Sequence, residues 1–192
     1  MMMDSLALFI NMNKRLFILG VLGAALAFLA APASAQPQDF TFSAGVGGGD
    51  FRNCFTAGIS YGQLMSSFLQ AEAEIFYYRQ PAEPSHTDGL AITSTAINFN
   101  ASILLQPDPT RRTVTPYAAL TAGVLYESET WEWDVERVFE RHSYTRWNVG
   151  LGAGIKVMLS RRSGLRLDFR WLRFLKEKTQ IPRYSLGYIL RF

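Results

Sequence analysis

Few residues of this sequence could carry out a hydrolytic reaction. A nucleophilic serine needs a base such as histidine beside it, with both side chains on one face. The sequence has two histidines, and His142 is adjacent to Ser143, whose side chain would point to the opposite face of an extended strand. The other, His86, lies near Ser85 and Asp88 in a composition typical of a polar turn. We therefore expect no catalytic residues and no enzyme activity.

Motifs that bind cofactors or metals are also missing from the sequence. The glycine-rich stretch 45–49 lacks the lysine and the following helix of a phosphate-binding loop. Cys54 is the single cysteine, which excludes an internal disulfide. Lysine and arginine number 19 against 16 acidic residues, a balance that gives no sign of a nucleic-acid partner. We expect no cofactor, no metal and no nucleic acid.

Charged residues recur opposite apolar residues, at alternate positions of several segments. Seven of them form the candidate site: Glu72, Glu74, Arg146, Lys156, Arg166, Asp168 and Arg170. If the apolar side of each segment faces lipid, these charges are enclosed, and they should pair across strands because an unpaired buried charge is costly. We interpret them as a structural network that plugs a narrow polar lumen. The alternative is a gate, in which the basic residues exchange carboxylate partners and open a path for ions.

The elements that must position these charges are predicted by a period of two. Apolar residues occupy every second position from Leu69 to Tyr77, with Gln70, Glu72 and Glu74 between them. Such alternation indicates a strand with one apolar face. Similar segments span residues 40–46, 55–61, 69–77, 97–105, 115–126, 146–157, 165–171 and 184–192. The sequence therefore predicts an all-β fold, an antiparallel up-and-down barrel of eight strands.

The connections between these segments favour a transmembrane barrel over a soluble one. Short turns are expected at Gly62–Ser66, Pro107–Arg112 and Ser160–Gly164, and longer loops at Gly47–Asn53, Gln80–Gly89, Glu127–Ser143 and Leu175–Arg183. Bacterial membrane barrels have short periplasmic turns, long external loops and aromatic girdles at both interfaces. Aromatic residues stand near the segment ends, for example Tyr77 and Trp147. The alternative is a soluble lipocalin-like barrel or a two-sheet sandwich with its apolar face inward.

The beginning of the sequence is typical of an export signal. Lys14 and Arg15 precede an apolar run from Leu16 to Leu29, and small residues then lead to Ala35. We predict a cleavable signal peptide over residues 1–35, with 1–11 as a spurious extension, and a single barrel domain over 36–192. An uncleaved membrane anchor is the alternative, although the apolar run is shorter than the roughly 20 residues that a spanning helix needs.

The final residues resemble the assembly signal at the C-terminus of outer-membrane barrels. The pattern consists of Ser185, Gly187, Leu190 and the terminal Phe192. The stretches 115–119, 148–154 and 165–171 resemble the small barrel family that includes the transmembrane domain of outer-membrane protein A and the outer-membrane protein X type. The resemblance implies location in the outer membrane of a Gram-negative bacterium and folding by the barrel-assembly machinery. It also implies lipopolysaccharide and other outer-membrane lipids as partners.

The segment from Glu127 to His142 combines six acidic residues and two arginines, a net charge of −4. We single out Trp131, Glu132, Trp133 and Asp134 as a candidate outer-loop surface. It could bind divalent cations that bridge lipopolysaccharide phosphates, or act as an adhesive surface. The simpler interpretation, which we favour, is a solvated hairpin in which two strands continue past the membrane.

Together these features predict an integral outer-membrane barrel with a structural or surface-interaction role. We expect a monomer. The alternatives are a narrow gated ion pore and an enzyme that modifies the acyl chains of lipid A.

Overall fold

The computed structural model describes residues 37–49, 54–84, 90–133, 139–176 and 179–192, with the backbone alone at 81–84, 90–91, 131–133 and 139–141. The predicted signal segment lies outside these ranges. No helix in the described part of the chain is long and apolar enough to span a membrane.

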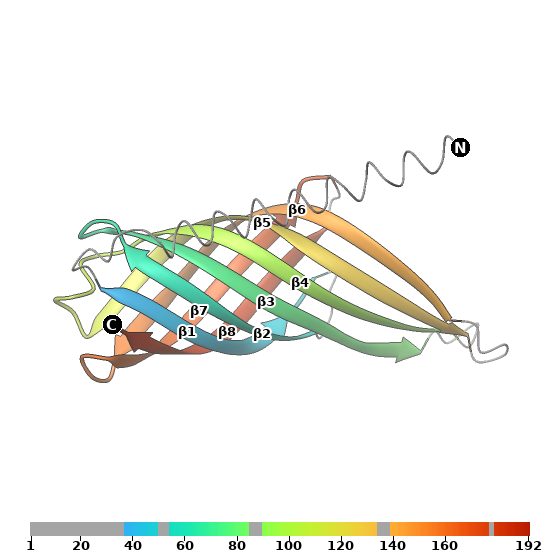
Figure 1. The fold of residues 1–192 in the computed structure, drawn as a ribbon, viewed down its shortest axis with the longest axis horizontal. Helices are drawn as coiled ribbons and strands as arrows, with labels where there is room; N and C mark the ends of the chain where they lie inside the picture. The colour runs from blue at the N-terminus through green and yellow to red at the C-terminus, as the bar shows by residue number, and fades with distance from the viewer. Residues whose placement is uncertain (1–36, 50–53, 85–89, 134–138, 177–178) are drawn as a thin grey trace. The chain divides into compact units, whose positions relative to one another are not determined.

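Eight antiparallel strands form a closed barrel (Figure 1). They are β1 (Gln38–Gly47), β2 (Cys54–Leu64), β3 (Leu69–Pro84), β4 (Leu90–Leu105), β5 (Val114–Trp133), β6 (Phe139–Met158), β7 (Ser163–Phe174) and β8 (Gln180–Arg191). Each strand pairs with its neighbours in sequence, and β8 closes the barrel against β1 from Asp39↔Arg191 to Gly47↔Arg183. The predicted all-β, up-and-down, eight-stranded architecture is confirmed.

The side-chain orientation is the reverse of that in a soluble barrel. Ile75 and Ile155 are each 42% exposed on the outer surface, whereas Glu72 is 3% and Arg170 0% exposed. The same division holds along β7 and β8, where exposed and buried residues alternate one by one. Apolar side chains therefore cover the outside and charged side chains are enclosed. The lipocalin-like alternative does not match this arrangement.

The strands differ in length on the two sides of the barrel. β5 and β6 have 20 residues each and β3 and β4 have 16, whereas β1, β2, β7 and β8 have 10 to 12. In Figure 1 the long strands β3 to β6 extend past the short ones, away from the end that carries the C-terminus. We call the C-terminal end the turn end and the opposite end the loop end.

Three of the predicted loops are wrong in extent because strand pairing continues into them. β3 pairs with β4 as far as Pro84↔Ala91, with an irregularity between Gln80 and Glu83. β5 pairs with β6 as far as Glu132↔Phe139, so that most of the predicted loop Glu127–Ser143 is strand, in agreement with the favoured interpretation of this segment as a hairpin extension. β8 likewise begins at Gln180. Where both faces of a strand meet water, apolar and polar residues no longer alternate, so the sequence gives no sign of the strand. The backbone hydrogen bonds between strands do not depend on this alternation and continue.

Candidate functional site: the charged interior of the barrel

A central network of arginines and carboxylates crosses the interior of the barrel. Glu72 on β3 is bonded by two arginines of β7: Arg166 donates through Nη2 at 2.9 Å and through Nη1, and Arg170 donates through Nη2 at 3.1 Å. Arg170 also donates to Ser102 at 3.2 Å and to Thr121 at 2.6 Å. The network thus joins β7 to strands on the opposite wall.

Asp168 is the second shared acceptor of this network. It accepts hydrogen bonds from Arg166 Nη2 at 2.9 Å and from Arg170 Nε at 3.0 Å. The hydroxyl of Tyr117 on β5 donates to the same carboxylate and accepts from Arg166 Nε at 2.7 Å. These side chains are almost fully buried, where a charge needs both an ion pair and hydrogen bonds to offset lost hydration.

Arg183 on β8 completes the central network, although sequence analysis assigned it to a loop. Its Nη2 donates to both oxygens of Glu74 at 3.1 Å, and its guanidinium lies 3.6 Å from the centre of the Phe76 ring. Asn100 donates to Glu74 at 2.7 Å. Three arginines therefore face three carboxylates. Ile181 and Pro182, which directly precede Arg183, interrupt the alternation that could have revealed it.

A second cluster lies at the turn end, where sequence analysis identified only Lys156. Its Nζ donates to Asp39 at 3.0 Å and to Gln70 at 2.6 Å. Arg191 donates to the same Asp39 at 2.7 Å and to the carbonyl of Pro109 at 3.1 Å. The β4–β5 turn is thereby tied to β8 across the end of the barrel.

Arg146 lies apart from the other six predicted residues. It forms an ion pair with Glu127 at 3.2 Å, and Ser94 donates to the same carboxylate at 2.8 Å. Buried apolar side chains separate this pair from the central network along the barrel: Cys54, Phe76, Tyr78, Ala96, Leu125, Phe174 and Ile181. The interior therefore contains an apolar cluster, next to the buried, hydrogen-bonded Asn98 and Asn148, in addition to the predicted polar groups.

Glycines on β6 provide the space for the large side chains of the network. A Cβ at Gly152 would collide with Arg170 Cδ, and one at Gly154 would collide with the Tyr117 ring. Their neighbours Leu151, Ala153 and Ile155 face outward and are exposed. The alternation of glycine with apolar residues on β6 is thus a requirement of the packing inside the barrel.

The remaining predicted residues take no part in this network. His142 stacks on Tyr144 with 6.5 Å between ring centres, and His86 and Asp134 lie outside the described residues. Trp131, Glu132 and Trp133 are at the end of β5, in a strand and not in a loop. In the assembly pattern, Ser185 and Gly187 are buried, Leu190 is half-buried and Phe192 is exposed. Within the described ranges no cluster of three His, Cys, Asp or Glu is suited to a metal.

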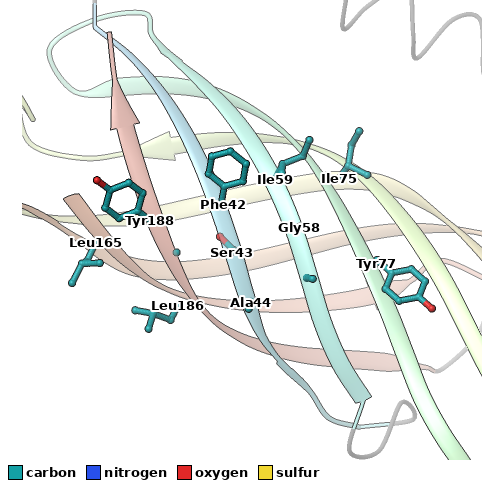
Figure 2. A pocket seen from close by; sticks show the side chains of 12 residues that line it. Phe42, Ser43, Ala44, Gly58, Ile59, Ile75, Tyr77, Leu165, Leu186 and Tyr188 are labelled. Carbon is teal, nitrogen blue, oxygen red and sulfur yellow. The ribbon is translucent and has the colours of Figure 1, made fainter. Parts of the chain in front are cut away.

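A shallow apolar groove of about 690 Å³ lies on the outer surface. Figure 2 shows Phe42, Ile59, Ile75 and Tyr77 projecting from β1, β2 and β3 around it. Leu165, Leu186 and Tyr188 border it on the side of β7 and β8. The groove carries no charged side chain, so this face suits hydrocarbon and not an ionic ligand.

The chain was compared with known families, proteins and structures. No family model matches it, and no curated protein sequence does. Among solved structures, a major outer membrane protein from Thermus thermophilus has 12% identity and a TM-score of 0.65, covering 83% of this chain and all of its own. Ail of Yersinia pestis in complex with the heparin analogue sucrose octasulfate has 10% identity and a TM-score of 0.58, covering 82% of this chain and 99% of its own.

Neisserial surface protein A has 17% identity and a TM-score of 0.57, covering 83% of this chain and 98% of its own. At such identities the likeness is one of fold. The closed eight-stranded barrel and its structural neighbours confirm the predicted resemblance: this chain has the fold of the small outer-membrane β-barrels.

Proposed function

We propose that this chain is an integral protein of the bacterial outer membrane with a filled lumen and a structural or surface-interaction role. The observation that carries the proposal is the inverted orientation, in which apolar side chains cover the barrel and a balanced ion network is enclosed by it. Such a surface would be unstable in water and is stable in hydrocarbon.

The height of the apolar surface supports insertion in a bilayer. On β5 the outward apolar side chains run from Val114 to Tyr126, and on β6 from Trp147 to Val157. These stretches are at least as long as the roughly 9–11 residues with which a tilted strand crosses the hydrocarbon. Tyr126 and Trp147 lie at the loop-end limit of the band, as expected for an aromatic girdle.

The filled lumen is supported by the arrangement of the buried side chains. Arg166, Arg170 and Arg183 extend into the interior from β7 and β8 and reach carboxylates on β3. An eight-stranded barrel is just wide enough to be filled by side chains. A gated pore remains the competing hypothesis, because Glu72 bonds two arginines at once and could exchange between them.

A surface role is supported by the part of β5 and β6 that continues beyond the apolar band. Outside Tyr126 and Trp147 the outward residues become polar, with Thr145 and Ser143 exposed. The hairpin therefore projects past the membrane, and the sequence of its tip is acidic. Divalent cations suit this charge, and they would bridge the acidic tip to the phosphates of lipopolysaccharide. Without such cations, a polyanion such as the sulfated sugar bound by Ail would be repelled by it.

We further propose that the protein is a monomer folded by the barrel-assembly machinery, without a catalytic role. His142 and Ser143 are consecutive residues of β6, so their side chains point to opposite faces of the strand, and the ring of His142 stacks on that of Tyr144. Mass spectrometry of lipid A from cells with and without the protein tests the enzyme alternative. An unchanged profile is expected, and a changed acyl composition would contradict the proposal.

Membrane insertion is tested by electrophoresis of membrane-extracted protein with and without boiling. The folded barrel should resist the detergent and migrate differently from the boiled chain. Planar-bilayer recordings then test the filled lumen: we expect no sustained conductance from the wild type, or from Glu72→Gln. A form that remains in the soluble fraction after export would contradict insertion, and a conductance altered by Glu72→Gln would favour the gate.

A further inference from the structure

Four arginines are concentrated at the turn end of the barrel, outside the network described above. Arg111 and Arg112 belong to the turn between β4 and β5, and Arg161 and Arg162 to the turn between β6 and β7. All four are exposed, and the side chain of Arg111 is 84% exposed. Their exposed guanidinium groups are available to anions in the surrounding medium.

The two turns adjoin each other in the structure. β5 and β6 pair as far as Val114↔Val157, and the N–H of Met158 donates to the carbonyl of Thr113 at 2.8 Å. The β4–β5 turn is held by the bond from Arg191 to the carbonyl of Pro109. The β6–β7 turn is held by the hydrogen bond from the N–H of Leu159 to the carbonyl of Ser163 at 2.9 Å, so the backbone is fixed on both turns while the arginine side chains are exposed.

Asp108 offsets one of these positive charges. It forms an ion pair with Arg111 at 3.2 Å and accepts hydrogen bonds from the hydroxyl and the N–H of Thr110. These hydrogen bonds hold the pKa of Asp108 below its ordinary value of 3.8, so that it is ionised at neutral pH. The two turns together carry a net charge of +3 within residues 106–113 and 159–162.

Large apolar side chains surround the arginines at the same end. Met65 is 54%, Phe68 61%, Leu159 64% and Phe192 78% exposed. The turn that holds Met65 and Phe68 adjoins the β4–β5 turn, since Gln106 N–H donates to the carbonyl of Phe68 at 2.9 Å. Exposed apolar and basic residues on one rim are typical of a surface that enters the headgroup region of a membrane. A soluble acidic partner would account for the arginines but not for the apolar side chains.

We infer that this rim, formed by Arg111, Arg112, Arg161 and Arg162, binds the phosphates of anionic phospholipids in the leaflet that faces the periplasm. The inference rests on the proposed insertion, because short turns mark the periplasmic end of such barrels. The guanidinium group donates two parallel hydrogen bonds to a phosphate, which makes it the side chain best suited to this ligand. The apolar residues fix the depth of the turns, and the arginines select the headgroup.

Lipid titration tests the inference on the whole exported chain, refolded in zwitterionic detergent micelles. Fluorescent phosphatidylglycerol is added to the wild type, to Arg111→Gln/Arg112→Gln and to Arg161→Gln/Arg162→Gln, with phosphatidylcholine as the neutral probe. A basic residue near an anionic surface contributes about five-fold to affinity. Each double variant lacks two such residues and should therefore bind phosphatidylglycerol roughly 25-fold more weakly. Added salt should weaken the binding of the wild type.

The matched control is Arg79→Gln/Arg173→Gln, which removes two exposed arginines toward the loop end. It should leave phosphatidylglycerol binding unchanged. Equal binding of the two lipids by the wild type, or equal losses in all three variants, would overturn the inference. Heat-dependent mobility on a gel and insertion into phosphatidylcholine vesicles are measured in parallel. An inserted wild type without lipid preference refutes this inference alone, whereas a wild type that never inserts refutes the proposed function with it.

Discussion

Asp168 and Glu72 each bond two arginines of β7, so the loss of one cation leaves two carboxylates short of a partner. Arg166, Arg170 and Arg183 are balanced by Glu72, Glu74 and Asp168. Burial makes this balance important, because an unpaired ion in a closed interior has neither water nor a counter-ion to stabilise it. The network is thus a set of mutually dependent contacts, and the effects of removing two members should not add.

Comparing a buried and an exposed arginine of β7 tests whether the stability of the network depends on burial. Arg170→Gln should lower the free energy of unfolding by about 3–5 kcal/mol, the usual effect of removing one member of a buried ion pair. Arg173→Gln, three residues further along the same strand and exposed, should change it by less than about 1 kcal/mol. Urea unfolding from lipid vesicles, followed by tryptophan fluorescence, measures both. Similar losses would contradict a network that depends on burial.

At the scale of the element, β6 combines two requirements in one strand. Its outer side carries apolar side chains, as the proposed contact with lipid requires, while its inner side must leave room for Arg170 and Tyr117, and glycine meets the second need. The strand therefore reads as an alternation of glycine and aliphatic residues. Glycine is a weak strand former, so its repeated use here reflects packing and not propensity.

A pair of substitutions at adjacent positions tests this account of β6. Gly152→Leu places a side chain against Arg170 and should lower the folded fraction strongly, since overpacking a filled interior costs about 1–3 kcal/mol or more. Ala153→Leu adds the same side chain on the exposed outer face and should fold normally. The folded fraction is read from heat-dependent gel mobility. A tolerated Gly152→Leu would mean that the lumen has spare volume.

The strands also show how far sequence reasoning reaches. Alternation located all eight strands and placed Glu72, Lys156, Asp168 and Arg170 on the inner face, because lipid and lumen impose opposite polarities on adjacent residues. It could not locate Arg183, which directly follows Pro182, or Asp39, which is the second residue of β1, because the alternation is broken or too short at these positions. Nor could it predict pairing distances, since the partners of a charge depend on strand register and stagger.

At the scale of the whole molecule, the orientation of the barrel surface determines its solvent. The exposed residues of β6 between Trp147 and Ile155 are the kind that a soluble protein would bury. The polar stretch that begins at Thr145 lies outside this band. On the proposed insertion, hydrocarbon and water contact different levels of the same strand.

The effects of Leu151→Arg, within the apolar band of β6, and of Ser143→Arg, in the polar stretch beyond it, can be compared. Arginine on the lipid face near the bilayer midplane costs about 2–4 kcal/mol, so Leu151→Arg should lower the free energy of unfolding from vesicles by that amount. Ser143→Arg, exposed beyond the aromatic girdle, should have little effect. If both variants were equally stable in vesicles, the apolar band would not be in contact with lipid.

The seam between β1 and β8 has a consequence for biogenesis. Asp39 on β1 is held by Lys156 and Arg191, which belong to later parts of the chain, and Gln38 and Phe192 exchange backbone hydrogen bonds in both directions. A sheet that lacked β8 would have two edge strands, β1 and β7, with unpaired backbone groups. Asp39 would also lack its ion pair with Arg191. Closure of the barrel therefore requires β8, the last strand of the chain, and until β8 is in place the open edges of the sheet need a chaperone or template to shield them.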